Sequence, residues 1–430
     1  MSYRGSSLRG VDRVAVIGLY LFALGAFAAP AAANVGLALT ALAALGRPRT
    51  TLAVLRRHPA GLPLLALAGY LILHGAGFGL ARGLSAADVD TLGDLAKLVL
   101  VLPLGLAVAG EPSRVRWALL LAGVSLLLCM ALHVNGAELR QALADGVTRL
   151  GFGLPMIAFG LYAATALLGL FLLVPATVGR LPAPQRPAAV VLSTAAAALF
   201  GVGLLLCRSR GAWLALALVL PVCAGALLRQ GRLPRPAIAS LGVLLAGGLL
   251  LGGESVARRV GDDQAAYEAL VGMVQAPSGG AALDALPPDS VGLRLRLSGL
   301  GFERWLERPL IGHGPDAGKR MIAAAADPAL RSMAHLHNTY LELLVRFGAF
   351  GLIGFGAVVA GFAAGLRGAT RRGGLAPELG LFLAGALALT LIWSAFDFRL
   401  LRQDFRFHAV LLGGIGLGLG LPRRKAPCAS

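Results

Sequence analysis

Apolar segments long enough to cross a membrane recur along the whole chain. This pattern excludes nearly every fold class except a bundle of membrane helices. A helix needs about 20 apolar residues to span the hydrocarbon core of a bilayer. About twelve runs of this kind centre on 14–29, 32–46, 62–81, 95–110, 115–134, 151–175, 188–206, 212–228, 237–253, 348–366, 379–396 and 407–421. The chain is 57% hydrophobic and only 14% charged, with a mean hydropathy of +0.76, which excludes an ordinary soluble protein. The predicted fold class is therefore all-α, a polytopic helical membrane protein.

The basic residues lie mainly in the short links between these segments, and their distribution predicts the orientation of the chain. The formal net charge is +18, from 39 basic and 21 acidic residues. With the N-terminus in the cytoplasm, the links on that side contain Arg4, Arg9, Arg13, Arg47, Arg49, Arg56, Arg57, Arg114, Arg116, Arg180, Arg186, Arg229, Arg232, Arg235, Arg367, Arg371, Arg372, Arg423, Arg424 and Lys425. The opposite side then receives Asp88, Asp90, Asp94, Glu138, Asp145, Asp262 and Asp263. This is the positive-inside pattern, so both termini are expected in the cytoplasm. The basic residues therefore indicate orientation in a lipid membrane, and nucleic acid is not expected as a partner.

One long segment, 254–338, lies between the ninth and tenth predicted spans, on the outer face. The chain therefore divides into helices 1–9 at 1–253, this outer loop at 254–338, and three further helices with a cytoplasmic tail at 339–430. Within the loop, 275–289 contains clusters of Gly, Ala and Pro and predicts irregular structure, whereas 291–307 is amphipathic and predicts a helix along the membrane surface. A loop of this length usually carries function.

Two histidines stand where the outer loop runs into the tenth span. His335 and His337 are followed by Asn338, and Glu342 lies about one helical turn further on, from where it is expected to orient His337 or bind it. A neutral imidazole at a boundary between water and lipid suits a general base for a sugar hydroxyl. The pair could also bind a metal, but no cysteine or carboxylate cluster nearby completes a ligand set, so no metal is expected.

Two pairs of arginines on the outer face are the second candidate. Arg208 and Arg210 lie between the seventh and eighth spans, where they oppose the positive-inside trend, and Arg294 and Arg296 lie on the amphipathic helix. A guanidinium fork binds phosphate through two hydrogen bonds, which suits a diphosphate held at the membrane surface. The alternative is that these arginines are interface anchors that face lipid headgroups.

Other polar and small residues near the outer face have a structural explanation. Charges of both signs in the turn between the last two spans favour a self-neutralising cluster, although they could also line the same outer cavity: Asp397, Arg399, Arg402, Asp404 and Arg406. Three glycines at a spacing of three, Gly348, Gly351 and Gly354, favour close helix packing.

Three motifs together resemble the O-antigen ligase and polymerase superfamily of bacterial envelope glycosyltransferases. They are SRGAWLAL at 209–216, an arginine followed by WLERPLIGHG at 305–314, with Arg294 the better-spaced arginine, and HNTYLELLVRFGAFG at 337–351. The spacing of His337, Asn338, Gly348 and Gly351 is most similar to that of the O-antigen ligase branch. The long late outer loop also fits the topology of this superfamily.

The resemblance implies a metal-independent and cofactor-free glycosyltransferase of the multi-spanning, lipid-donor type (GT-C-like), in the bacterial inner membrane with its active site facing the periplasm. Its donor would be a glycan on undecaprenyl diphosphate and its acceptor a sugar hydroxyl of lipid A–core. Arg210 and Arg294 would then hold the diphosphate, with Arg208 and Arg296 as their near-duplicates, and His337 would activate or position the acceptor. An O-antigen polymerase, a protein O-oligosaccharyltransferase and a non-enzymatic transporter of lipid-linked glycans remain as alternatives.

Overall fold

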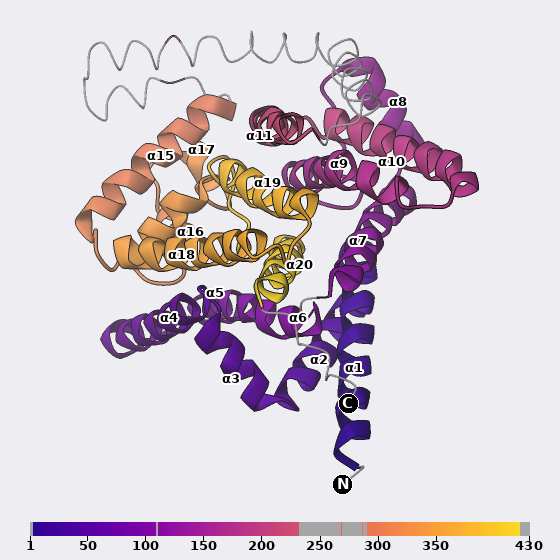
Figure 1. Ribbon diagram of the computed structural model, residues 1–430. Helices are drawn as coiled ribbons and strands as arrows, with labels where there is room; N and C mark the ends of the chain where they lie inside the picture. Colours follow the sequence, from indigo (N-terminus) through magenta and orange to yellow (C-terminus); the bar gives the residue numbers. More distant parts are fainter. Residues whose placement is uncertain (1–2, 109–110, 232–267, 269–285, 287–289, 422–430) are drawn as a thin grey trace.

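The computed structural model describes residues 3–108, 111–231, 268, 286 and 290–421 (Figure 1). The helices along the chain are α1 (Tyr3–Gly25), α2 (Pro30–Leu45), α3 (Pro48–Arg57), α4 (Gly61–Arg82), α5 (Ala86–Ala96), η1 (Lys97–Leu100), α6 (Val101–Val108), α7 (Pro112–His133), α8 (Gly136–Asp145), α9 (Met156–Val178), η2 (Ala183–Gln185), α10 (Arg186–Cys207), α11 (Arg210–Arg229), α15 (Ser290–Glu307), α16 (Ala317–Ala323), α17 (Pro328–Arg331), α18 (Thr339–Arg371), α19 (Pro377–Ser394) and α20 (Gln403–Gly420). These described residues contain no strand, so the all-α prediction is confirmed.

Eight helices of the described part are long and apolar enough to cross a membrane, which makes this a multi-pass membrane protein. They are α4, the continuous 86–108 segment, α7, α9, the 183–207 segment that includes α10, α11, α18 and α19. Each coincides with one predicted span. The first two and the last predicted spans fall on α1, the shorter apolar helix α2, and α20. The predicted span at 237–253 and the irregular stretch at 275–289 lie outside the described residues.

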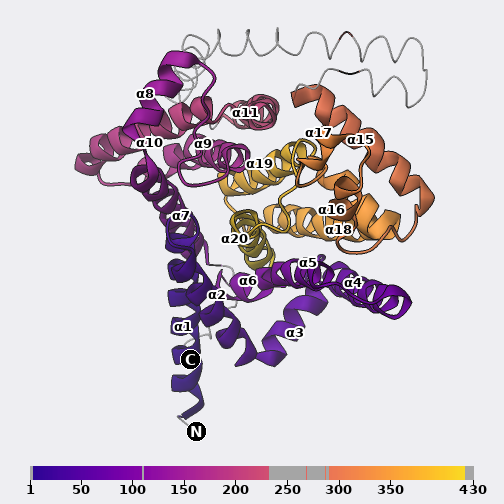
Figure 2. The same cartoon turned by 180° about the vertical axis from the view of Figure 1, so that it is seen from behind.

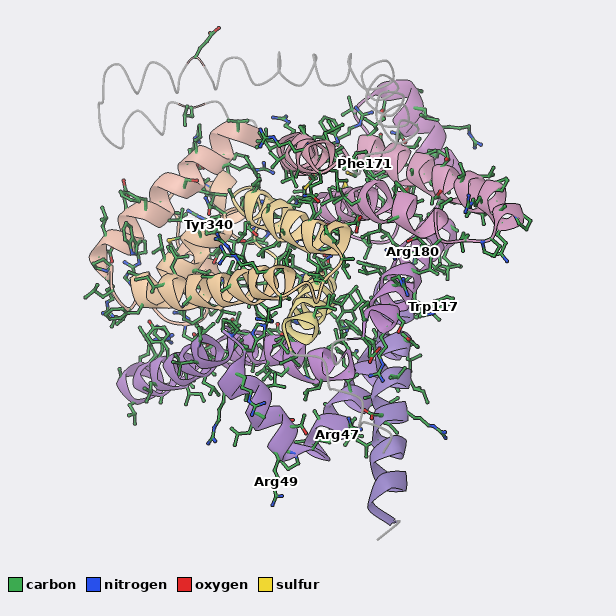
Figure 3. All side chains as sticks on the ribbon, viewed as in Figure 1. Arg47, Arg49, Trp117, Phe171, Arg180 and Tyr340 are labelled. Carbon is green, nitrogen blue, oxygen red and sulfur yellow. The ribbon has the colours of Figure 1, made fainter. Side chains whose placement is uncertain are left out.

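The C-terminal helices lie at the centre of the bundle. α20 packs against α6 and α18, and α19 packs against α9 and α11, so helices from both halves of the chain enclose one hydrophobic core. Figure 2 shows the same arrangement from behind, with α20 between the α6 side and the α9 side. Interior polar groups are tied to neighbouring helices: Tyr340, which lies inside the bundle in Figure 3, donates from its hydroxyl to the Leu391 carbonyl of α19 at 2.6 Å. Arg49, by contrast, extends away from the ribbon.

A smaller body formed by α15, α16 and α17 lies beside the first half of α18. Leu297 of α15 is fully buried against Leu336, Leu341 and Val345, because the apolar face predicted for 291–307 is turned toward α18. The carboxylate of Asp88, at the start of α5, ties this body to the bundle. It accepts hydrogen bonds from Arg82 at 3.0 Å, from the Asp316 backbone N–H at 3.0 Å and from Arg320 at 3.1 Å. A buried carboxylate needs such partners, so these contacts fix where the loop docks.

The long α18 is broken at Gly348, which has φ +65° and ψ −169°. The turn after α15 lies against this break: Ala349 donates to the Pro309 carbonyl at 2.8 Å and His313 donates to the Val345 carbonyl at 2.8 Å. Tyr70 of α4 donates to the Phe347 carbonyl at 2.5 Å. The close packing expected at Gly348 is present, but against the loop backbone of Leu310 and Ile311 and not against another helix. This glycine opens the helix so that another backbone segment can approach it, whereas Gly354 does pack closely, on Leu67 of α4.

Candidate active site

His337 holds an unusual backbone position at the entrance to α18. Its φ is +53°, in the left-handed region that side chains other than glycine rarely occupy. Asn338 follows as the N-cap of α18, and its side-chain oxygen accepts hydrogen bonds from the backbone N–H groups of Tyr340 at 3.0 Å and Leu341 at 3.1 Å. Such backbone strain costs of order 1–3 kcal/mol and persists where the surroundings fix it, often at functional sites. Asn338 thus supports His337 by fixing where the helix begins.

The carboxylate beside His337 is Asp397, from the connection between α19 and α20. Its side chain is fully buried, and its Oδ1 lies 3.2 Å from Nδ1 of His337 and 3.5 Å from Nε2 of His335. Arg399 approaches the other oxygen, with 3.2 Å between Nε and Oδ2. The Thr339 hydroxyl donates to the Asp397 backbone carbonyl at 2.7 Å, which fastens this connection to the start of α18.

Glu342 does not orient His337, which corrects the expectation from the sequence. Its carboxylate accepts from Arg346 Nε at 2.6 Å and from the Leu336 backbone N–H at 2.9 Å, and all of Glu342 is buried. Arg346 also contacts the backbone carbonyl of Pro315. Glu342 therefore acts on the backbone next to His337 and holds the entry segment on α18.

The hydrogen bonds around His335 determine where its proton lies. The His337 backbone N–H donates to Nδ1 of His335 at 3.2 Å, so Nδ1 carries a lone pair and the proton of a neutral ring is on Nε2, toward Asp397. Burial lowers the pKa of His335 to about 4, so the ring is neutral at neutral pH. Burial would raise the pKa of Asp397, but the close contact with His337 and the charges of His335 and Arg399 hold it below its usual range.

This arrangement leaves Nε2 of His337 as the basic atom. An ionised Asp397 favours the tautomer of His337 with its proton on Nδ1, which places the lone pair on Nε2. The two atoms are close, but neither makes an aligned hydrogen bond. Hydrogen bonds of this kind are often poorly aligned before substrate binds and tighten in the complex. The pair can therefore accept a proton from a hydroxyl and stabilise the resulting imidazolium.

The same three residues could be considered as a metal site. One donor atom each from His335, His337 and Asp397 lies within 4.8 Å of the others. Two observations favour proton transfer over metal binding. His335 Nε2 already carries a proton, which a metal would have to displace. Two arginines, Arg149 and Arg294, also interact electrostatically with Asp397. Their positive charges oppose the binding of a metal cation at this carboxylate.

Arg149, Arg210 and Arg294 interact electrostatically with one another, and Arg149 and Arg294 also interact with Asp397. Burial lowers the pKa of Arg294, and the positive charges of Arg149 and Arg210 lower it further, while Asp397 opposes the shift. The pKa of Arg149 is lowered first by burial and then by Arg210 and Arg208. Arginine stays protonated despite such shifts, so the three form a partly buried cationic cluster. A cluster of this charge would suit an anionic group such as a phosphate.

The near-duplicate arginines have structural partners. Arg208, the left-handed C-cap of α10, donates to the Thr148 carbonyl at 3.2 Å and to the Ala142 carbonyl at 3.1 Å, and it is almost fully buried. Arg296 binds Asp327 at 2.9 Å and also donates to the Leu286 carbonyl. Within each pair, then, the structure brings Arg210 and Arg294 to the cluster and uses Arg208 and Arg296 to hold loops in place.

The charged turn between α19 and α20 is only partly self-neutralising. Asp397 pairs with Arg399, as expected, but Arg406 pairs with Asp94 at 3.0 Å and Asp404 accepts from the Tyr162 hydroxyl at 3.0 Å. Sequence reasoning ranked Asp397 low because of its charged neighbours, and it did not consider Arg149. The available signal for Asp397 was a carboxylate in a short connection between two membrane helices.

Residues 195–356 match the family model described as O-antigen ligase. The match contains Arg210, Arg294, His335 and His337, whereas Arg149 and Asp397 lie outside it. A search of curated proteins finds no match to the chain. The motif resemblance, the multi-pass helical fold and this match agree with one another. Residues 195–356 are therefore similar to the O-antigen ligase family, in agreement with the motif resemblance.

Proposed function

We propose that this protein is an O-antigen ligase that transfers a glycan from undecaprenyl diphosphate to a sugar hydroxyl of lipid A–core. The observation that carries the proposal is the contact between His337 and Asp397 beside the cluster of Arg149, Arg210 and Arg294. A base and an anion site, side by side at one end of a membrane bundle, are what transfer from a lipid diphosphate requires.

The proposed reaction uses each group once. The acceptor hydroxyl gives its proton to Nε2 of His337 while its oxygen forms a bond to the anomeric carbon of the donor. The bond between that carbon and the diphosphate oxygen breaks, and the electron pair leaves with undecaprenyl diphosphate. Arg210 and Arg294 stabilise the charge that develops on the diphosphate, and Asp397 stabilises the imidazolium. Because guanidinium groups supply the positive charge, we propose that the reaction needs neither a metal nor another cofactor.

The proposed location follows from the charge pattern. The basic links are assigned to the cytoplasm, together with both termini, so His337 and the arginine cluster face the periplasm from the bacterial inner membrane. The glycan donor and lipid A–core would both be reached from the surrounding bilayer. The contact between His337 and Asp397 also argues for an enzyme over a transporter, because a transporter has no evident need for a base at a headgroup site.

The test is a reconstituted transfer assay with purified protein, undecaprenyl-diphosphate glycan and a chelator. Three acceptors are compared in parallel: lipid A–core, a second lipid-linked glycan, and a protein that carries serine and threonine sites. Transfer to lipid A–core alone is expected. Growth of the lipid-linked glycan would identify a polymerase, and a glycosylated protein would identify a protein O-oligosaccharyltransferase; either result would replace the ligase proposal.

Conservative substitutions should separate Arg210 and Arg294 of the cluster from Arg208. Arg210→Lys and Arg294→Lys remove the planar fork at the cationic cluster, so the transfer rate is expected to fall by about 10²–10³-fold, as on loss of one charge-stabilising donor. Arg208→Lys leaves the carbonyls of Ala142 and Thr148 poorly satisfied, so it is expected to cost about 1–3 kcal/mol of stability. Transfer rate per folded molecule and thermal unfolding in detergent are the two measurements. Equal transfer losses for Arg208→Lys and Arg210→Lys, at equal stability, would contradict the assignment.

A further inference from the structure

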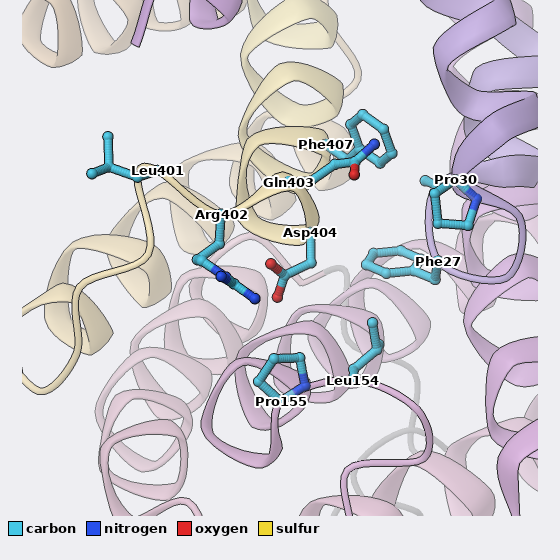
Figure 4. Close-up of a pocket in the computed structure, with 10 residues that line it drawn as sticks. Phe27, Pro30, Leu154, Pro155, Leu401, Arg402, Gln403, Asp404 and Phe407 are labelled. Carbon is cyan, nitrogen blue, oxygen red and sulfur yellow. The ribbon is translucent and has the colours of Figure 1, made fainter. Parts of the chain in front are cut away.

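Three connections of the bundle meet around a pocket of about 390 Å³ (Figure 4). The turn between α1 and α2 provides Phe27 and Pro30, and the segment before α9 provides Pro155. The segment between α19 and α20 and the start of α20 provide Arg402, Gln403 and Asp404. This volume is within the range of small-molecule sites, about 300–1,000 Å³. All three connections fall on the outer face in the charge-based topology, together with His337.

The pocket shares a segment with the candidate active site. Arg402 follows Asp397 by only five positions, so their Cα atoms are no more than about 18 Å apart even if the chain were fully extended. Arg399, between them, pairs with Asp397. On the bundle side, Tyr162 of α9 donates to Asp404 at 3.0 Å, which fixes the carboxylate at the pocket wall. The pocket and Asp397 therefore lie on one short connection.

The pocket is lined by both apolar and polar side chains. Phe27, Pro30 and Pro155 form an apolar wall, and Arg402, Gln403 and Asp404 supply a guanidinium, an amide and a carboxylate, as Figure 4 shows. Among the described residues, the Arg402 guanidinium has no hydrogen-bond or ion-pair partner, and its side chain points toward the same space as Asp404.

This combination fits an uncharged sugar. A pyranose ring has an apolar C–H face that can lie on an aromatic or proline surface, and its hydroxyls donate to carboxylates and accept from guanidinium and amide groups. A phosphate would be attracted by Arg402 but repelled by Asp404. The cluster of Arg149, Arg210 and Arg294, by contrast, has three positive charges against the one negative charge of Asp397. The two sites thus differ in the charge that they accept.

We propose that this pocket binds a neutral sugar residue of the acceptor glycan, adjacent to the residue whose hydroxyl is brought to His337. The inference rests on the proposed glycan transfer and adds where the acceptor is recognised. It assigns acceptor specificity to Arg402, Gln403 and Asp404, separate from donor binding at the arginine cluster.

The test compares Arg402→Gln with Arg140→Gln, a change at an exposed arginine of α8 that does not line the pocket. Arg402→Gln is expected to raise the KM for lipid A–core by roughly tenfold, as for loss of a hydrogen bond from a charged group. Its KM for the lipid-linked donor should stay within twofold of the wild-type value. Its thermal unfolding midpoint should equal that of wild type within error. Arg140→Gln should leave both KM values unchanged.

Direct binding separates failure of this inference from failure of the proposed function. Core oligosaccharide released from lipid A is titrated into the reconstituted wild type, Arg402→Gln, Gln403→Ala and Arg140→Gln. Weaker binding in the two pocket variants alone would support the pocket, even if no transfer to lipid A–core were seen. Equal binding by all four proteins, or an equal rise of donor and acceptor KM in Arg402→Gln, would overturn it.

Discussion

His337→Asn is expected to lower the glycan-transfer rate by about 10²–10⁴-fold, the usual contribution of a general base. Asparagine is among the residues that best tolerate positive φ, so the backbone at φ +53° should be retained. The change removes the only imidazole nitrogen that the hydrogen bonds of the site leave free to accept a proton from the acceptor. Single-turnover transfer, with the enzyme in excess over the donor and the acceptor saturating, measures the chemical step.

A histidine away from the cluster provides the matched control. His133, exposed at the end of α7, is replaced in the same way by His133→Asn, which should transfer at the wild-type rate. Donor binding by His337→Asn should be unchanged, because the arginine cluster is intact. If His337→Asn transferred as fast as His133→Asn, His337 could not be the base.

Gly348→Ala should be the most damaging single change to the fold. With φ +65° and ψ −169°, this residue lies in a region essentially restricted to glycine, and a Cβ would lie 2.2 Å from the Leu310 carbonyl carbon and oxygen. Both the strain and the clash oppose the native break in α18, so roughly 3–5 kcal/mol of stability should be lost. The yield of monodisperse protein in detergent and the thermal midpoint measure this loss.

Gly356→Ala is the control for that change, since it lies further along the same helix. A Cβ on Gly356 would meet nothing within 4 Å, and alanine favours the helix by about 1 kcal/mol over glycine. Its thermal midpoint should therefore equal or slightly exceed that of wild type. A Gly348→Ala protein that unfolds at the same temperature as Gly356→Ala would show that the break in α18 is not required.

The sequence was sufficient for the fold class because the bilayer imposes a simple rule on segment length. The break at Gly348 could not be predicted, since three glycines at equal spacing look the same whether they allow packing or a turn of the backbone. The predicted helix at 291–307 corresponds to α15, because its apolar periodicity was strong enough to define a buried face.

The candidate site was only partly visible in the sequence. His337, Arg210 and Arg294 stand in short motifs, so local pattern identified them. Asp397 lies far along the chain from His337, and the packing of α19 and α20 on α18 brings the two together. Arg149 lies in a loop with no motif, and the hydrogen bonds that hold Arg208 on the Thr148 and Ala142 carbonyls follow only from the fold. These contacts depend on tertiary packing and cannot be deduced from the sequence.

Asp397→Asn is the first experiment to perform, because it removes one negative charge and keeps the shape of the side chain. With no carboxylate to hold the proton of His337 on Nδ1, the turnover number for transfer to lipid A–core should fall by about 10²–10⁴-fold, while the KM for the donor stays constant. An Asp90→Asn protein, with the same change at an exposed carboxylate of α5, serves as the control. Wild-type turnover by folded Asp397→Asn would contradict the assignment of His337 and Asp397 as the transfer centre.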